Sequence, residues 1–174
     1  NETNQGKGAS LIKGLNYALA KNFDAVITMD GDGQHLAEEI PFFLRLATYS
    51  DSGILIGNRM HKSENMPLVR VITNTLMSWF ISAIARQKIP DTQCGYRIIK
   101  KEVLKKINLV SSKFEIESEM LENLVFSHLL RLGFKIQSIP IKTVYSGEKS
   151  RIHPIVDTVR FLKFVILELW TMNH

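Results

Sequence analysis

Two aspartates, Asp30 and Asp32, directly follow a short apolar stretch at residues 25–29. The stretch is rich in β-branched side chains, which predicts a buried strand, and the glycines beside the aspartates allow the backbone to turn sharply. Neighbouring carboxylates repel each other unless a cation lies between them. Carboxylate and amide oxygens suit Mg²⁺ or Mn²⁺, so the sequence indicates a divalent-metal site made by Asp30, Asp32 and the amide of Gln34. A tight turn capped by aspartates is the alternative.

The position of the aspartate pair suggests what such a metal would do. Open α/β sheets bind their ligands at the carboxyl ends of strands. A metal held there that also bound a diphosphate would neutralise charge on a phosphate leaving group. An EF-hand is excluded, because counting from Asp30 places His35 and Pro41 where that loop needs glycine and glutamate.

Two further segments carry groups that could act on a ligand. Lys7 lies in a Gly-Lys-Gly sequence that lacks the spacing of a phosphate-binding P-loop. A ligand contact and a simple glycine turn opening a helix both remain open for it. Asp91 lies in the polar loop "PDTQCGYR", where a carboxylate can act as a general base or orient a nucleophile. A structural turn aspartate is the alternative.

Helical and strand-like segments alternate along the chain, which predicts an α/β fold. Pro140 interrupts the last predicted strand and favours an edge position for it. The predicted helices cover residues 8–22, 35–49, 68–86, 114–133 and 155–172, and a further helix is predicted directly after residue 99. The predicted strands cover residues 25–29, 52–59, 96–99 and 135–146.

Composition limits the classes of protein that the chain can be. Its 174 residues, with 45% hydrophobic and 22% charged residues, suit one globular domain. The net charge of +5 favours anionic partners, but the basic residues are scattered and do not alternate with aromatics, which argues against nucleic acid. The single cysteine, Cys94, excludes an internal disulfide and favours the cytoplasm. The polar start without methionine suggests a fragment that lacks an N-terminal part.

Several stretches in order resemble the inverting nucleotide-sugar glycosyltransferases of family 2, and most closely the dolichol- and polyprenyl-phosphate sugar synthases. The matching stretches are "NQGKGASLIKGLNYA", "DAVITMDGDGQH", "ILIGNR", "DTQCGYRIIKKEVL", "FEIESEML" and "IPIKTVYSGEKSRI". "DGDGQH" at a strand end, followed some sixty residues later by D-x-x-x-G-Y-R, is the most specific combination. The resemblance implies a GT-A, Rossmann-like three-layer sandwich with a mostly parallel sheet, lacking its first βαβ portion.

The resemblance also implies roles for particular residues. Asp30 and Asp32 match the pair that binds metal and diphosphate, with Gln34 as a third metal ligand. Arg59 resembles an arginine that gates the site or reaches the donor phosphate. Asp91 matches a residue that acts as base or positions the acceptor. Gly95 and Arg97 belong to the same acceptor-side motif as Asp91. Lys149, Ser150 and Arg151 resemble a basic G-x-S-K loop that meets the acceptor's phosphate, but their order differs and leaves Lys149 as the matching residue. Arg70 and Asn74 are expected to face the same site, and Lys7 is a further expected ligand-binding residue.

The expected domain organisation is a catalytic part at residues 1–154 followed by a helix at residues 155–174 with a wide apolar face. That helix suits a membrane interface, and packing on protein is the alternative. The expected reaction transfers a sugar from a nucleotide-diphosphate sugar to a polyprenyl phosphate, with Mg²⁺ or Mn²⁺, at the cytoplasmic face of a membrane. A hydroxyl acceptor in cell-envelope biosynthesis, or an inactive nucleotide-sugar-binding fragment, are the other hypotheses.

Overall fold

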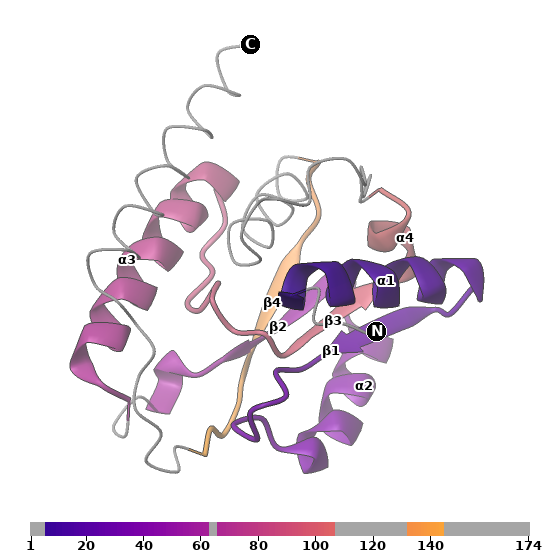
Figure 1. Cartoon of the computed structure of the whole chain (residues 1–174). Coiled ribbons are helices and arrows are strands. Elements are labelled where there is room, and N and C mark those ends of the chain that lie inside the picture. Colours follow the sequence, from indigo (N-terminus) through magenta and orange to yellow (C-terminus); the bar gives the residue numbers. More distant parts are fainter. Residues whose placement is uncertain (1–5, 63–65, 107–131, 145–174) are drawn as a thin grey trace.

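The computed structural model describes residues 6–62, 66–106 and 132–144 of the chain. In these residues, helices and strands follow one another as expected for an α/β protein (Figure 1). The helices are α1 (Gly6–Ala20), α2 (Ile40–Tyr49), α3 (Leu68–Ala85) and α4 (Lys101–Leu104), with short 3₁₀ turns η1 (Ala37–Glu39) and η2 (Met60–Lys62). The strands are β1 (Ala25–Thr28), β2 (Ile54–Asn58), β3 (Arg97–Lys100) and β4 (Ile136–Pro140).

The four described strands form one mixed sheet in the order β1-β3-β2-β4. β3 runs antiparallel to both β1 and β2, whereas β2 and β4 are parallel. Three of the four strands therefore share a direction, as the expected mostly parallel sheet requires. The reversed strand β3 lies between two of them, so only one neighbouring pair is parallel, and local sequence patterns carried no sign of this arrangement.

Helices cover both faces of the centre of this sheet. In β2, the successive residues Ile54, Leu55 and Ile56 are all buried. Neighbouring residues of a strand point to opposite faces, so burial of all three requires cover on both sides. Figure 1 shows α3 along one side of the molecule, away from α1 and α2.

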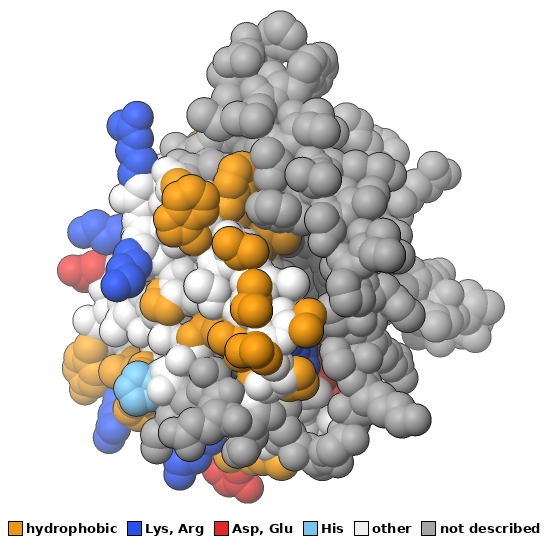
Figure 2. Space-filling view, turned by 90° about the vertical axis from the view of Figure 1, so that its left-hand side faces the viewer, with side chains coloured by type: hydrophobic (Ala, Val, Ile, Leu, Met, Phe, Trp, Pro, Cys, Tyr) orange, Lys and Arg blue, Asp and Glu red, His pale blue; other side chains and the backbone are white. Residues whose placement is uncertain are grey.

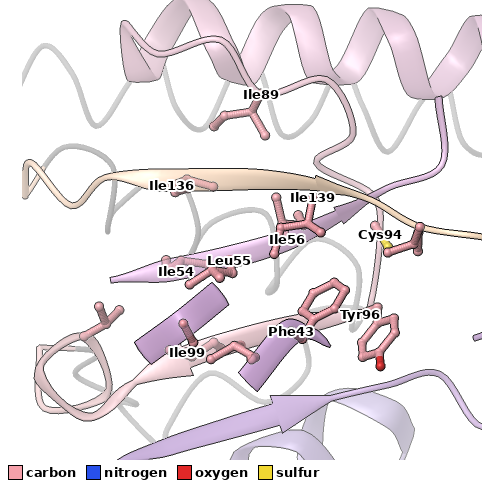
Figure 3. Close-up of a cluster of buried hydrophobic side chains, with 14 of the residues drawn as sticks. Phe43, Ile54, Leu55, Ile56, Ile89, Cys94, Tyr96, Ile99, Ile136 and Ile139 are labelled. Atoms are coloured by element: carbon pink, nitrogen blue, oxygen red, sulfur yellow. The ribbon is translucent and has the colours of Figure 1, made fainter. Parts of the chain in front are cut away.

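The core joins the sheet to the loop that follows α3 (Figure 3). The rings of Phe43 and Tyr96 stack at a centroid distance of 4.4 Å, which fixes α2 against the residue before β3. Cys94 and Ile89, from the same loop, are also buried in this cluster. The loop that carries Asp91 is therefore anchored by apolar packing on both sides of that residue.

Most sequence-predicted elements are confirmed within the described residues. α1, β1, α2, β2, α3, β3 and β4 lie inside or within two residues of the predicted ranges. β4 is an edge strand of the described sheet, as Pro140 predicted. The predicted helices at residues 114–133 and 155–172 lie outside the described residues, except for Leu132 and Gly133.

Candidate active site

The two sequence motifs that predicted the site meet at Asp30 and Gly95. Asp30 follows β1, Gly95 precedes β3, and the two strands are neighbours in the sheet. A β-carbon placed on Gly95 would overlap the Asp30 carboxylate, with Oδ1 only 2.6 Å away. Thr28 strengthens this junction, because its hydroxyl donates a hydrogen bond to the Gly95 carbonyl at 2.8 Å. The glycine therefore provides the space that the aspartate occupies.

The loop after β1 is closed by hydrogen bonds from its own side chains. Asp32 is exposed and its Oδ1 accepts a hydrogen bond from the Gln34 backbone N–H at 3.0 Å. His35 is buried, and its Nδ1 accepts from the Asp30 backbone N–H at 3.2 Å, which places the ring proton on Nε2. Gly33 has a φ of 76°, a conformation that favours glycine. The turn that the Asp-Gly pairs predicted is thus present.

His35 also ties this loop to the loop before β3. Its ring stacks on Tyr96 with centroids 5.2 Å apart, and its Nε2 lies 3.9 Å from the Cys94 sulfur. On the other side, His35 forms a β-bridge with Thr143, after β4. No role for His35 follows from the sequence alone, because the histidines show no metal-ligand spacing. Its position directly after the aspartate loop is the one local sign of its contact with that loop.

Arg59 and Asp91, the two predicted catalytic residues, form a buried ion pair with each other. Arg59 Nε and Nη2 donate to the two oxygens of Asp91 at 2.8 and 2.9 Å, and the Arg59 backbone N–H donates to Oδ2 at 3.0 Å. Asp91 is fully buried and Arg59 is 4% exposed. A bidentate guanidinium–carboxylate pair fixes both side chains, so the geometry favours a positioning role for Asp91.

Arg97 holds the shape of the loop at residues 91–97. Its Nε donates to the Cys94 carbonyl at 2.8 Å, and its Nη2 donates to the Thr92 carbonyl at 3.0 Å. The Thr92 backbone N–H in turn donates to the hydroxyl of Ser78 on α3 at 2.9 Å. These bonds explain why an arginine is useful at position 97, and contact of Arg97 with a ligand stays a prediction.

α3 contributes a buried polar side chain beside this loop. Asn74 lies one helical turn before Ser78 on the same face of α3 and is 8% exposed. Its Nδ2 has no hydrogen-bond partner among the residues that the structure describes. A buried amide without a hydrogen-bond partner lowers the free energy of unfolding, and such groups are often hydrogen-bonded to a ligand or a water molecule.

The surroundings of the loop shift the pKa values of two side chains. Burial raises the pKa of the Cys94 thiol to about 11, and the nearby Arg59 charge opposes that shift only in part. Burial also raises the pKa of Tyr96, and the Glu39 carboxylate raises it further. Both side chains are therefore neutral near pH 7, and they pack in the hydrophobic core beneath the loop.

The donor set beside β1 suits a hard divalent cation. Asp30 and Asp32 offer carboxylate oxygens and Gln34 an amide oxygen, the ligand types that Mg²⁺ and Mn²⁺ take along with phosphate oxygens and water. Among the described residues, no group of three or more His, Cys, Asp or Glu side chains is placed to hold a metal.

Other predicted site residues lie at the limits of the described residues or outside them. The side chain of Lys7, and all of Lys149 with its neighbours Ser150 and Arg151, lie outside the described residues. The backbone of residue 7 lies in the first turn of α1, as one of the two interpretations of Gly-Lys-Gly predicted. Arg70 lies on α3 one turn before Asn74 and is half-buried.

Comparison with known proteins identifies the family. A model of glycosyl transferase family 2 matches residues 1–108, more than half of the chain. The chain belongs to this family, and its α/β architecture with a mixed sheet agrees with part of a GT-A, Rossmann-like domain. The resemblance inferred from the motifs is thereby confirmed.

The chain is similar to curated relatives over most of its own length. It is 32% identical over 148 residues to an uncharacterised protein of Methanocaldococcus jannaschii, covering 82% of this chain and 59% of the relative. It is 29% identical to a UDP-N-acetylglucosamine–dolichyl-phosphate N-acetylglucosaminyltransferase of Methanococcus voltae, covering 83% and 58%. It is 27% identical to an undecaprenyl-phosphate mannosyltransferase of Micrococcus luteus, covering 82% and 58%. The chain thus spans about three fifths of the length of these relatives.

None of the helices in the described part of the chain is both long enough and apolar enough to cross a bilayer.

Proposed function

We propose that the protein transfers a sugar from a nucleotide-diphosphate sugar to a polyprenyl phosphate, with inversion at the anomeric carbon and with Mg²⁺ or Mn²⁺. Membership of glycosyl transferase family 2 supports the reaction class. Relatives named as dolichyl-phosphate, undecaprenyl-phosphate and polyprenol-phosphate sugar transferases support the acceptor class. The observation that carries the proposal is the junction of Asp30 with Gly95, which joins the donor-side and acceptor-side motifs in one site.

On the donor side, Asp30 and Asp32 hold the cation and Gln34 completes the protein's share of the ligands. The cation would offset the negative charge that develops on the departing nucleoside diphosphate. Asp30 is placed by Gly95 behind it and by His35, which accepts from its backbone N–H. Asp32 is exposed, which leaves it accessible to a cation arriving with the donor.

On the acceptor side, the buried pair of Arg59 and Asp91 supplies a fixed guanidinium close to the loop that reaches Asp30. A lipid phosphate is already an anion near neutral pH and needs no strong base, so Asp91 orients Arg59 instead of removing a proton. The Nδ2 of Asn74, which has no hydrogen-bond partner within the described part of the chain, is a donor available for an anionic oxygen. Arg70, one turn earlier on α3, adds positive charge on the same side.

The test is transfer of radiolabelled sugar from UDP- or GDP-sugars to polyprenyl phosphate by the full-length protein and by its Asp32→Asn variant. Loss of one metal-binding carboxylate should lower the rate by roughly 100-fold or more, since it weakens stabilisation of the leaving group. Asp51→Asn, an exposed aspartate before β2, is the matched control and should keep full activity. Undiminished transfer by Asp32→Asn, with an intact fold, would contradict the metal assignment. Transfer to a glycan hydroxyl but not to polyprenyl phosphate would contradict the acceptor class.

We further propose that the protein works at the cytoplasmic surface of a membrane, where a polyprenyl phosphate presents its head group. The expected division into a catalytic part at residues 1–154 and an interfacial helix at residues 155–174 belongs to this proposal. Lys149 lies just before that helix in the sequence and would add positive charge near a lipid phosphate.

A further inference from the structure

The outer face of α3 carries an unusual concentration of exposed apolar side chains. We call these five residues the outer stripe of α3: Leu68, Val69, Ile72, Leu76 and Trp79. Their exposed fractions range from 50% for Val69 to 73% for Leu68, with Trp79 at 69%. Figure 2, which looks onto the side of the molecule where α3 lies, shows hydrophobic side chains running down this face.

The spacing of these residues makes them one continuous surface. At 3.6 residues per turn, they fall within an arc of about 100° and extend about 17 Å along the helix axis. Asn74, Ser78 and Ile81 lie on the opposite, buried face. α3 therefore has the candidate active site against one face and an apolar stripe on the other.

The charges around the stripe indicate what covers it. α3 contains no acidic residue, and its one charged residue is Arg70. Arg86 and Lys88, just beyond its C-terminal end, are exposed. Aliphatic side chains and a tryptophan on a helix without acidic residues, with two exposed basic residues just beyond one end, fit the boundary between the head groups and acyl chains of an anionic membrane.

We infer that the outer stripe of α3 docks the protein on an anionic lipid bilayer. This inference rests on the proposed function, and it deepens it by assigning a membrane-facing surface. With the stripe in the bilayer, α3 separates the acyl chains from the residues that would meet the acceptor's phosphate. A polyprenyl phosphate could then keep its chain in the membrane while its head group enters beside Asn74 and Arg59.

Trp79 provides a direct probe, since the chain has only two tryptophans and a Trp170→Phe background leaves Trp79 alone. Vesicles of phosphatidylcholine with phosphatidylglycerol should shift the Trp79 emission to shorter wavelength and carry the protein upward in flotation. Leu76→Glu should weaken vesicle partitioning by roughly tenfold or more, because it removes one buried leucine. Leu44→Glu on α2 is the matched control, since Leu44 is 48% exposed and Leu76 56%.

Three results would overturn the inference. The first is an unshifted Trp79 emission with vesicles. The second is an equal effect of Leu44→Glu. The third is a Trp79 emission already typical of a buried tryptophan in buffer, because a second copy or another part of the chain would then cover the stripe.

A separate assay keeps this inference apart from the proposed function. Leu76→Glu should lose transfer to a long polyprenyl phosphate in vesicles but keep transfer to a short, water-soluble prenyl phosphate. Equal loss with both acceptors would count against membrane docking. If the unsubstituted protein uses neither acceptor, the proposed function fails, while the vesicle-binding result still decides the docking surface.

Discussion

The carboxylate of Asp30 lies against the α-carbon of Gly95, sixty-five residues later in the chain, at a distance that leaves no room for a β-carbon. This contact explains why an aspartate motif after β1 occurs with a glycine in the loop before β3. Each motif is incomplete without the other, because the glycine makes the space and the aspartate fills it.

Gly95→Ala should therefore displace the Asp30 carboxylate and weaken the site. The added methyl group would overlap both carboxylate oxygens, and such overpacking costs about 1–3 kcal/mol of unfolding free energy. Urea unfolding measures the stability, and Mn²⁺ titration followed by electron paramagnetic resonance measures the effect on the site. Gly31→Ala is the control, since its β-carbon would meet no atom within 4 Å. If Gly95→Ala binds Mn²⁺ as tightly as the control does, the contact between Gly95 and Asp30 does not contribute to metal binding.

Removing one partner of the buried pair of Arg59 and Asp91 should destabilise the protein strongly. Asp91→Ala leaves the guanidinium without its counter-charge inside the protein, which costs about 3–5 kcal/mol. The double variant Arg59→Met/Asp91→Leu should lose clearly less unfolding free energy than the single variants Arg59→Met and Asp91→Leu lose in sum. A double-mutant cycle measured by urea unfolding tests this. Asp24→Ala, which removes an exposed ion pair with Lys101, should leave the urea midpoint unchanged. Additive effects of the two core substitutions would mean that the pair is not coupled.

His35 should act through the backbone N–H of Asp30. His35→Phe keeps a ring to stack on Tyr96 but removes the Nδ1 acceptor, whereas His35→Asn keeps an acceptor near the same place. Loss of a group that supports a metal ligand typically lowers metal affinity by about 10–100-fold. Mn²⁺ affinity should therefore fall in His35→Phe and be largely retained in His35→Asn. The reverse order would show that ring packing, not the hydrogen bond, supports the loop.

The buried Cys94 thiol should make stability depend on pH in the alkaline range. Its pKa is raised from 9.0 to about 11 in the folded protein, so the unfolded chain loses this proton first as pH rises. The stabilisation is fully present below pH 9 and is lost between pH 9 and 11, with a slope of about 1.4 kcal/mol per pH unit. Urea midpoints of the unsubstituted protein should therefore fall faster over this window than those of Cys94→Ala. Parallel curves for the two proteins would contradict the assignment.

The sequence predicted those features that depend on local pattern. The apolar periodicity of α3 and the β-branched residues of β1 gave both elements within about one residue, and the Asp-Gly pairs gave the turn after β1. The ion pair between Arg59 and Asp91 could not be predicted from the sequence. The two residues are thirty-two positions apart, and no local sequence pattern indicates that the end of β2 meets the loop after α3. The contacts of His35 were not predicted for the same reason, since its ring stacks on Tyr96, a residue far away in the sequence.

The reversed strand β3 has a consequence for how the protein assembles. Among the described strands, β1 is hydrogen-bonded to β3, and this pairing can form only after residues 97–100 have been synthesised. Long-range pairing of this kind slows folding, because a large loop must close before any contact compensates for it. During translation, the Asp30 carboxylate therefore leaves the ribosome long before Gly95, the residue that makes room for it in the folded protein.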